Sequence, residues 1–564
     1  MLFYTLLTSS LLGCKSTQED SGTKQVPLEP AVQDREPPHL RRLSLRQYEN
    51  TIHSILGNRI LEDAGIYATD EAGESIDLLV IPSNLEPDVE VEGLISVGSS
   101  ITSISPIGVE RYENAAYMIA DQVHSILINE NESLNNSDAQ AAHVALLGCD
   151  SESFESSDDC LNNFIETFGL KAWRRPLLTT EMDRLFSLHS SITEASGDRY
   201  IGLKYTIAAI LQSPHFIYRL EEKEADSDLL TNHSIASKLS FLLWNNTPDT
   251  ELLTAAEAGL LHDPLILEEQ VDRMLADDQI KEGVRNLFTE ILGLYKLDSL
   301  TKDPLVFTHA SSDLGPAARE ETLRTLEWLI LEQDGDFRDI LTTQTTFVDR
   351  RLAALYDIPA PSPDGFAQTF LERSKGRHGL LGHASYLTSQ AHATSTSATL
   401  RGVFIRTKLL CQVIPPPPAN IDTSIPEADA TSPTLRERIA SHLEDPSCAG
   451  CHQLTDQIGL GLENFDGIGR WRTTENGATI DPTGTLDSVA FNNAWELGKA
   501  VRNHPNLPYC FAKHLHQYAS GHHTSESESV YLDWLTETFW ANEYSFLDLL
   551  RTVALSDHFR RAGE

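Results

Sequence analysis

The sequence predicts a mainly α-helical protein built as an array of several modules, and three observations support this fold class. Apolar residues recur at helical spacing through most of the chain, whereas the alternating pattern of strands is rare. The 564 residues are too many for one hydrophobic core and favour three to five packed units. A C-x-x-C-H motif at residues 448–452 opens a predicted helix and marks a small module near the C-terminus.

The first residues have the pattern of an export signal. A short apolar stretch, Leu2–Leu12, is followed by Gly13 and Cys14, as in a bacterial lipobox whose cysteine is lipidated after cleavage, although no Lys or Arg precedes it. The alternative is an apolar start with a free thiol. Residues 15–38 are polar and contain proline, as expected of a tether. We therefore expect an exported, lipid-anchored protein, periplasmic or at the outer membrane or cell surface, with membrane contact through the lipid only.

The formal net charge of −40 excludes some classes of partner. Phosphates would be repelled, so neither nucleic acid nor an anionic membrane surface is expected to bind. Nothing in residues 41–399 has the pattern of a hydrolase triad, a phosphate loop or a paired metal motif.

Helical periodicity continues along the chain with one interruption. Residues 76–81 and 89–91 look extended, so we expect a few short strands near residues 76–106. Predicted helices cover Leu40–Leu56, Glu110–Asn129, Phe164–Ser190 with a break at Arg175-Pro176, Tyr200–Gln212, Ser234–Trp244, Leu265–Leu294, Glu320–Leu331, Thr346–Tyr356, Leu435–Leu443, Phe511–Tyr518 and Leu532–Phe559.

These patterns divide the chain into nine segments, and a polyproline run at residues 415–418 is the clearest boundary. The segments are a lipoprotein signal (1–14), a tether (15–38), a helical and extended module (39–135), a small helical module with a disulfide (136–198), a helical module (199–300), a helical module with a Gly/Ser/His loop (301–414), a Pro-rich linker (415–433), a cytochrome c-like module (434–525) and a helical tail (526–564).

The seven cysteines are consistent with an oxidising compartment. With Cys14 lipidated and two cysteines in the C-x-x-C-H motif, four remain. Cys149 and Cys160 flank a Ser/Asp/Glu loop and are predicted to form a local disulfide. A second bridge between Cys411 and Cys510 would tie the linker region to the haem module. The alternative for both pairs is buried free thiols.

The motif Cys448-Ala449-Gly450-Cys451-His452 has the form of a c-type haem attachment site. Two thiols one helical turn apart can each form a thioether to a haem vinyl group, and His452 can bind the iron as an axial ligand. The alternatives are a redox disulfide, which normally accompanies a βαβ pattern, and half of a zinc site, for which no second ligand pair follows.

Several residues around the motif are candidate partners of the haem. Trp471 can line its edge, and Arg470 and Arg472 can pair with its propionates or, equally, with Glu463 or Asp466. None of the four methionines lies in the haem module, so a His/Met iron pair within it is excluded. Candidates for a second axial histidine are His504, His514, His516, His522, His523 and the loop histidines His378, His383 and His392, which are otherwise incidental residues of a polar loop.

The order of these motifs resembles the secreted bacterial proteins grouped around domain of unknown function 1592, which end in a planctomycete-type cytochrome-like domain. The matching stretches are Arg41-Arg42-Leu43-Ser44 with Tyr48, Cys149…Cys160 with Ala172–Leu177, Ser213–Phe216, Leu239–Trp244 with Thr247–Asp249, Thr396-Ser397…Arg401-Gly402 with the proline run, and Cys448–His452 with Gly459, Leu462–Asp466 and Gly469–Arg472. The resemblance implies a mainly helical, exported protein with a haem module and no established reaction. One departure is His522, where the family usually has an arginine after the glycine.

Three functions are compatible with the sequence. The first is an anchored haem c protein that exchanges single electrons with a secreted or periplasmic redox protein. The second is a haem-dependent oxidoreductase whose open iron acts on peroxide or an oxidisable substrate. The third is a surface module that binds a glycan or a protein and uses the cysteine motif structurally.

Overall fold

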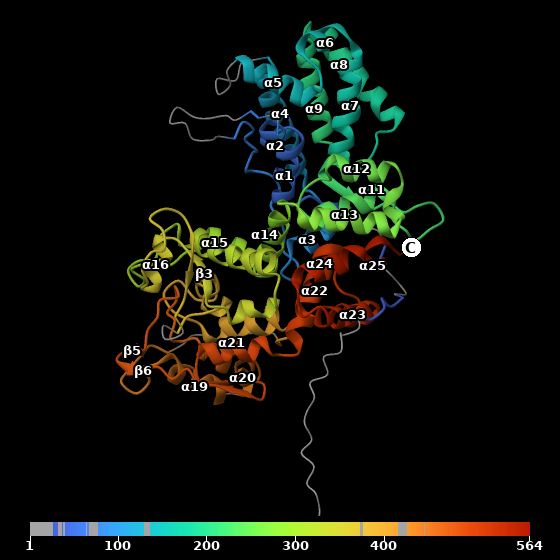
Figure 1. Cartoon of the computed structure of the whole chain (residues 1–564). Coiled ribbons are helices and arrows are strands. Elements are labelled where there is room, and N and C mark those ends of the chain that lie inside the picture. The colour runs from blue at the N-terminus through green and yellow to red at the C-terminus, as the bar shows by residue number, and fades with distance from the viewer. Residues whose placement is uncertain are drawn as a thin grey trace, which may run out of the picture.

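The computed structural model describes residues 26–31, 36–37, 40–63, 65–66, 77–128, 136–372, 376–415, 426–444 and 446–563. The predicted lipidation site, Cys14, lies outside these residues, as does most of the Pro-rich linker. The chain is mainly α-helical, which confirms the predicted fold class. Figure 1 shows its helices gathered in an N-terminal lobe, a central body and a third lobe that carries the C-x-x-C-H motif. No described helix is long and apolar enough to span a membrane.

The N-terminal lobe has its own hydrophobic core, centred on Tyr48, Tyr112, Phe154 and Phe216. A disulfide joins Cys149 to Cys160 at its edge, as predicted. The helices of this lobe are α1 (Leu45–Ile55), α2 (Asn58–Asp63), α4 (Pro106–Leu127), α5 (Asn136–Leu147), α6 (Ser151–Ser156), α7 (Asp158–Trp173), α8 (Thr179–Ser196), α9 (Arg199–Leu211) and α10 (Pro214–Ile217).

The central body combines segments that are far apart in the sequence. Helices from residues 232–299 pack against the C-terminal helices around one core that includes Trp244, Phe288, Phe511 and Phe546. Its elements are α3 (Ile95–Ile101), α11 (Asn232–Leu243), α12 (Thr250–Glu257), η1 (Leu260–His262), α13 (Pro264–Ala276), α14 (Ile280–Ile291), η2 (Leu294–Ser299), α22 (Asn506–Ser520), η8 (Glu526–Glu528), α23 (Ser529–Ala541), α24 (Phe546–Leu555) and α25 (Asp557–Arg560).

The third lobe contains the C-x-x-C-H motif and most of the short strands. Part of its apolar side chains, such as Phe337, Phe404 and Leu462, belong to the core of the central body, and two smaller clusters lie around Leu352 and Tyr356 and around Leu435 and Leu460. Its elements are α15 (Leu314–Glu327), the π-helical η3 (Trp328–Gln333), η4 (Phe337–Leu341), β3 (Thr345–Val348), α16 (Arg350–Tyr356), β4 (Ala367–Phe370), η6 (Leu380–Gly382), α17 (Ala384–Ser389), α18 (Ala398–Phe404), the π-helical η7 (Ile405–Leu409), α19 (Leu435–Glu444), α20 (Pro446–Leu460), β5 (Thr474–Glu475), β6 (Ala478–Thr479), β7 (Gly484–Leu486), β8 (Val489–Phe491) and α21 (Ala494–Arg502).

The strands form four antiparallel pairs, β1 (Leu40–Arg42) with β2 (Tyr218–Leu220), β3 with β4, β5 with β6, and β7 with β8. The expectation of strands near residues 76–106 is wrong for the described part of that range, which contains helix α3 and one isolated bridge between Val91 and Leu94. A tertiary contact explains the helix. The buried carboxylate of Glu290 accepts a hydrogen bond of 2.8 Å from the backbone N–H of Ser96 and so caps the first turn of α3.

The arginine pair near the start of the described chain has a structural role. Residues 40–42 form a strand rather than the first turn of a helix, because Ser44 and Gln47 make a capping box that starts α1 at Leu45. The buried guanidinium of Arg41 donates to the carbonyl oxygens of Ala519 and Tyr518, at 2.8 and 3.0 Å. Arg41 thereby joins the N-terminal strand to the C-terminal end of α22.

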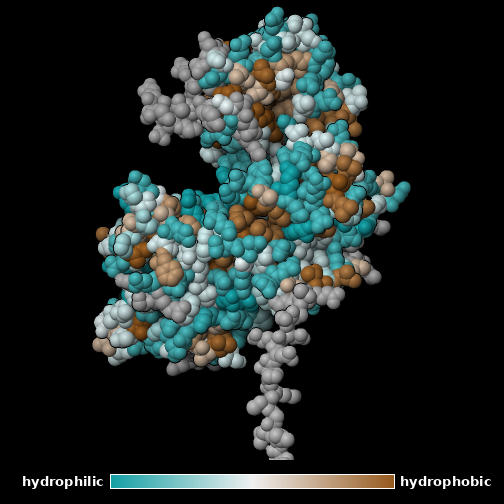
Figure 2. All heavy atoms as spheres, viewed as in Figure 1, coloured by the Kyte–Doolittle hydropathy of each residue, from teal (hydrophilic) through white to brown (hydrophobic). Residues whose placement is uncertain are grey.

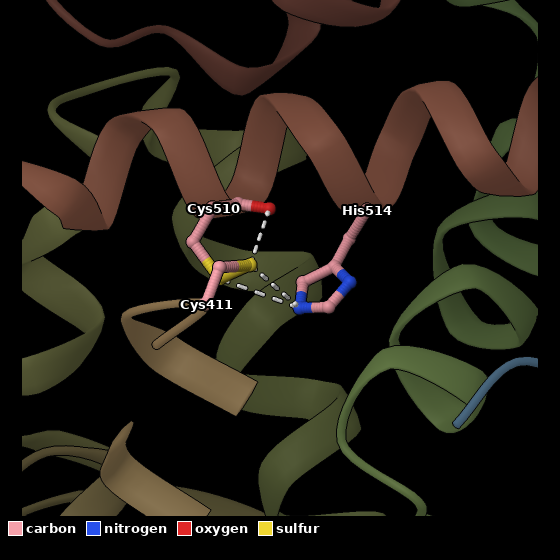
Figure 3. A group of neighbouring side chains, drawn as sticks. All are labelled: Cys411, Cys510 and His514. Atoms are coloured by element: carbon pink, nitrogen blue, oxygen red, sulfur yellow. Dashed lines mark hydrogen bonds between the residues drawn. A yellow bond between two sulfur atoms is a disulfide. The ribbon is translucent and has the colours of Figure 1, made fainter. Parts of the chain in front are cut away.

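The second predicted disulfide is also present and joins Cys411, just after η7, to Cys510 in α22 (Figure 3). Its sulfur atoms lie 3.7 and 3.4 Å from Nε2 of His514, which also faces the carbonyl oxygen of Lys408 at 3.1 Å. Burial lowers the pKa of His514 to about 4, so this imidazole is neutral at physiological pH. The bridge ties the lobe with the C-x-x-C-H motif to the central body.

Candidate functional site

The C-x-x-C-H motif occupies the first half of α20, at the lower edge of the molecule in Figure 1. Pro446 is the first residue of this helix, where its fixed φ is favourable and no N–H is needed. The second half of α20 packs tightly against α18: a Cβ atom at Gly459 would overlap the carbonyl group of Ala398, and one at Gly402 would overlap that of Thr455. The first half of α20 is therefore free to face outward, and both Cys451 and His452 are partly exposed there.

Cys451 carries a free thiol. Its Sγ atom donates a hydrogen bond of 2.9 Å to the carbonyl oxygen of Pro415, at the end of the described segment before the Pro-rich linker. The side chain of Cys448 lies outside the described part of the structure.

His452 is oriented by a buried carboxylate. Its Nδ1 atom lies 2.7 Å from Oδ2 of Asp456, one helical turn further along α20. Asp456 is fully buried, and its other oxygen accepts hydrogen bonds from the hydroxyls of Thr399 and Thr455, at 2.9 and 3.1 Å. A carboxylate only accepts, so Nδ1 carries the proton and Nε2 is the atom that would bind a metal.

The role of Asp456 was missed by sequence reasoning, although a signal was present. Residues four apart on a helix lie on the same face, so a His followed by an Asp at this spacing predicts a contact. Thr399 has no such signal, because its contact with Asp456 depends on how α18 crosses α20.

The donor set fits a covalently attached haem. A free thiol and an imidazole lie on adjacent residues near the helix start, and the imidazole is held as a metal ligand is, by a second residue at Nδ1. Two exposed apolar side chains belong to the same region, Leu454 in α20 and Val413 two residues before Pro415. An apolar porphyrin face would shield such side chains from water.

The three residues after the motif that were predicted to contact haem have other partners. Arg472 forms the salt bridge to Glu463, with 2.8 Å between Nη2 and Oε2, which is the alternative left open by the sequence. Arg470 is exposed, and its backbone N–H donates to Asp466 at 2.8 Å. Trp471 packs edge-on against Phe465, with 5.0 Å between ring centroids, and also contacts Gly376.

A buried arginine in α18 organises the loop between α20 and β5. Arg401 is fully buried and donates to the carbonyl oxygens of Leu462, Phe465 and Asp466, at 2.9, 3.1 and 2.8 Å. It also lies 3.3 Å from the carboxylate of Glu463. Burial raises the pKa of Glu463, and the charges of Arg401 and Arg472 act against this rise.

Most of the candidate second ligands of the iron contact other side chains, and His392 is exposed in its loop. His378 packs on Trp495, His383 lies 3.0 Å from the hydroxyl of Thr322, and His514 lies at the disulfide described above. Four more have acidic partners: His504 contacts Asp487, His523 contacts Glu92, and His516 and His522 both face Glu528.

Four family models match successive parts of the chain. Each is described as a protein of unknown function, and they are DUF1595 at residues 160–221, DUF1592 at 230–358, DUF1588, also named PSCyt3, at 377–475, and DUF1585 at 487–559. The chain belongs to the planctomycete cytochrome-like multi-domain family that contains DUF1592. No curated protein and no solved structure matches it.

The limits of the last two family-model matches in this DUF1592-family chain mainly follow the division between the third lobe and the central body. The cytochrome-like PSCyt3 range contains α18, α20 and the whole motif. The DUF1585 range begins after it and contains α21 to α24, of which α22, α23 and α24 belong to the central body. The segment predicted as one module at residues 434–525 therefore contributes to both the third lobe and the central body.

We expect replacement of Arg401 by methionine to lower the free energy of unfolding by about 3–5 kcal/mol, because Glu463 and several carbonyls would lose a buried donor. Urea unfolding of the full chain measures this change. The matched control is Arg351→Met, which breaks an exposed ion pair of 2.8 Å with Asp313 and should cost at most about 1 kcal/mol. Equal effects of the two substitutions would contradict the role given to Arg401.

Proposed function

We propose that this protein is an exported c-type haem protein that exchanges single electrons with a secreted or periplasmic redox partner. The observation that carries the proposal is the free thiol of Cys451 beside an imidazole, His452, that Asp456 holds by Nδ1. The match of residues 377–475 to a cytochrome-like family model supports it.

In this proposal Cys448 and Cys451 hold the haem covalently and Nε2 of His452 ligates its iron. When bound, the haem supplies an iron centre that gains and loses one electron. Asp456 fixes the ring orientation and makes the imidazole a stronger electron donor, since a carboxylate stabilises positive charge on the ring. The partial exposure of α20 at Cys451 and His452 supports electron exchange with another protein, because it leaves the attachment site at the surface.

The charge of the chain indicates what kind of partner would dock. The formal net charge is −40, and the face in Figure 2 is mainly hydrophilic with separate apolar patches. A partner with a basic surface would be steered towards such a protein, and the association would weaken as salt is added.

A haem enzyme with an open iron site is the second candidate. It is favoured by the other contacts of the candidate second histidines in the described part of the chain, with partners such as Asp487, Glu92 and Glu528. The ferric absorbance spectrum separates the two functions. A low-spin spectrum that cyanide does not change supports the electron carrier, and a high-spin spectrum that cyanide converts supports the enzyme.

The variant with Cys448→Ser and Cys451→Ser should contain no covalent haem, because both thioether positions are gone. The measurement is a pyridine haemochrome spectrum of denatured protein matured in a periplasm with the cytochrome c maturation machinery. The matched control, Cys149→Ser with Cys160→Ser, removes the other closely spaced pair and should keep one haem per chain. A wild-type chain without covalent haem would instead support a surface-binding module with a structural cysteine motif.

The substitution Asp456→Asn should raise the reduction potential of the haem. A neutral amide stabilises positive charge on His452 less well than a carboxylate, and a difference of about 1 kcal/mol between the oxidised and reduced forms corresponds to roughly 40 mV. A spectroelectrochemical titration measures the shift. Asp481→Asn is the control, since Asp481 pairs with Arg436 away from the motif. A potential that does not rise would refute the assigned role of Asp456.

We also propose that the protein is anchored by lipid at Cys14. Support comes from the apolar stretch before this residue, and the two disulfides are consistent with export to an oxidising compartment. The variant Cys14→Ser should lose the lipid, which mass spectrometry of the N-terminal peptide detects, and should move from the membrane to the soluble fraction. Unchanged membrane association of the variant would rule the anchor out.

A further inference from the structure

Three histidines and one glutamate converge at the C-terminal end of α22, in the central body and outside the C-x-x-C-H motif. Oε1 of Glu528 lies 2.9 Å from Nε2 of His516, 3.1 Å from Nε2 of His558 and 3.6 Å from Nε2 of His522. His516 comes from α22, His522 follows that helix, Glu528 ends η8 and His558 lies in α25. His516, Glu528 and His558 thus form one group of mutually close ligand atoms, and His522 approaches the same glutamate oxygen from outside that group.

The spacing of these atoms is that of a metal site. With metal–ligand bonds of about 2.0–2.2 Å, two ligand atoms of a tetrahedral centre are about 3.3–3.5 Å apart. The distance of 3.6 Å from the glutamate oxygen is close to this range, and those of 2.9 and 3.1 Å are hydrogen bonds that would lengthen by a few tenths of an ångström around an ion. The atoms of His516, Glu528 and His558 all lie within 4.8 Å of one another.

Hydrogen bonds to the atoms of His522 and Glu528 that face away from the group fix the orientation of both side chains. Nδ1 of His522 lies 2.8 Å from the carbonyl oxygen of His523, and a carbonyl accepts only, so this nitrogen carries the proton. Nε2 of His522 therefore faces the carboxylate of Glu528 either as a proton donor or, in the neutral ring, with a lone pair that a bound cation would share with the carboxylate. The other oxygen of Glu528 accepts from the backbone N–H of Ser525 at 2.8 Å, which fixes the carboxylate as a bound ligand is fixed.

The group is largely buried. His516 and Glu528 are almost fully buried, and Tyr531 packs on His558 with 4.3 Å between ring centroids. A small cavity of about 30 Å³ adjoins the three histidines, which is enough for a water molecule. The cavity is also lined by Lys238 and Glu221, whose charged atoms lie 3.4 Å apart, and by Glu36 and Arg561.

We propose that His516, His522, Glu528 and His558 bind one divalent first-row transition metal ion, with Zn²⁺ as the best fit. Three imidazole nitrogens and one carboxylate oxygen form a ligand set that suits zinc, and four ligands complete a tetrahedral shell. The ion joins α22 to η8 and α25 and so fastens the C-terminal helices to the central body. This site is independent of the haem proposal, because it shares no residue with the C-x-x-C-H motif.

The other clustered His and Cys residues do not form an equivalent site. Cys411 and Cys510 near His514 are joined in a disulfide, which leaves them without thiolates for a metal (Figure 3). Of the two groups of three such ligand atoms found among the described residues, the group at Glu528 is the one without a disulfide.

The test is the metal content of the full chain, produced without a polyhistidine tag. Because thiols also bind zinc, the measurements use the variant with Cys448→Ser and Cys451→Ser as the parent. After equilibration with Zn²⁺ and desalting, elemental analysis should find one zinc per chain. Co²⁺ should replace it with the intense visible absorbance of a four-coordinate centre.

Two substitutions in this parent locate the ion. His522→Ala removes a partly exposed ligand and should leave the fold intact while weakening zinc binding by at least about 100-fold in a chelator competition. His523→Ala is the matched control, because this exposed neighbour pairs with Glu92 and should bind zinc like the parent. Circular dichroism confirms that both variants are folded.

The parent should also melt at a lower temperature when a chelator removes the ion, and His522→Ala should lose most of this difference. The proposal is overturned if the folded parent retains no zinc after desalting. It is equally overturned if His522→Ala binds zinc and Co²⁺ as tightly as the parent, since the ion would then lie elsewhere.

Discussion

The close crossing of α18 and α20 is the constraint on which the candidate haem site depends. Gly402 and Gly459 let the two backbones meet, because any side chain at either position would overlap a carbonyl group of the other helix. This contact buries Asp456 against Thr399 while the preceding turn of α20 remains at the surface. Helix α20 thus carries both the buried Asp456 that orients His452 and the partly exposed side chains of Cys451 and His452.

The lobe that carries the motif is not an independent appendage. Arg401 binds the loop after α20, and the disulfide between Cys411 and Cys510 connects the end of η7 to α22. At the other end of α22, Arg41 binds the last carbonyl groups. Helix α22 therefore receives contacts from both the start of the described chain and the motif-bearing lobe, and the histidine cluster at Glu528 lies at its C-terminal end.

The parts of the fold that depend on local sequence patterns were largely predictable. The presence of the long amphipathic helices was predicted from periodic apolar residues, but not always their limits: α4 begins at Pro106 and not at Glu110. The helix predicted over Thr346–Tyr356 was wrong at its start, where residues 345–348 form β3 and α16 begins at Arg350. Both disulfides were predicted from the even number of cysteines left over. Helix α3 was not predicted, because Ser- and Gly-rich residues have no strong preference and a distant carboxylate, Glu290, caps the helix.

The sequence by itself determined the helical class, the family and the C-x-x-C-H spacing, because each of these depends on residues close together in the chain. Only the tertiary structure decided that Arg472 binds Glu463, that Asp456 holds His452 from a buried position, and that His516, His522 and His558 surround Glu528. The physical reason is the same in each case. Which side chains meet across a helix crossing is set by the packing of whole elements, and a single sequence contains no local signal of that packing.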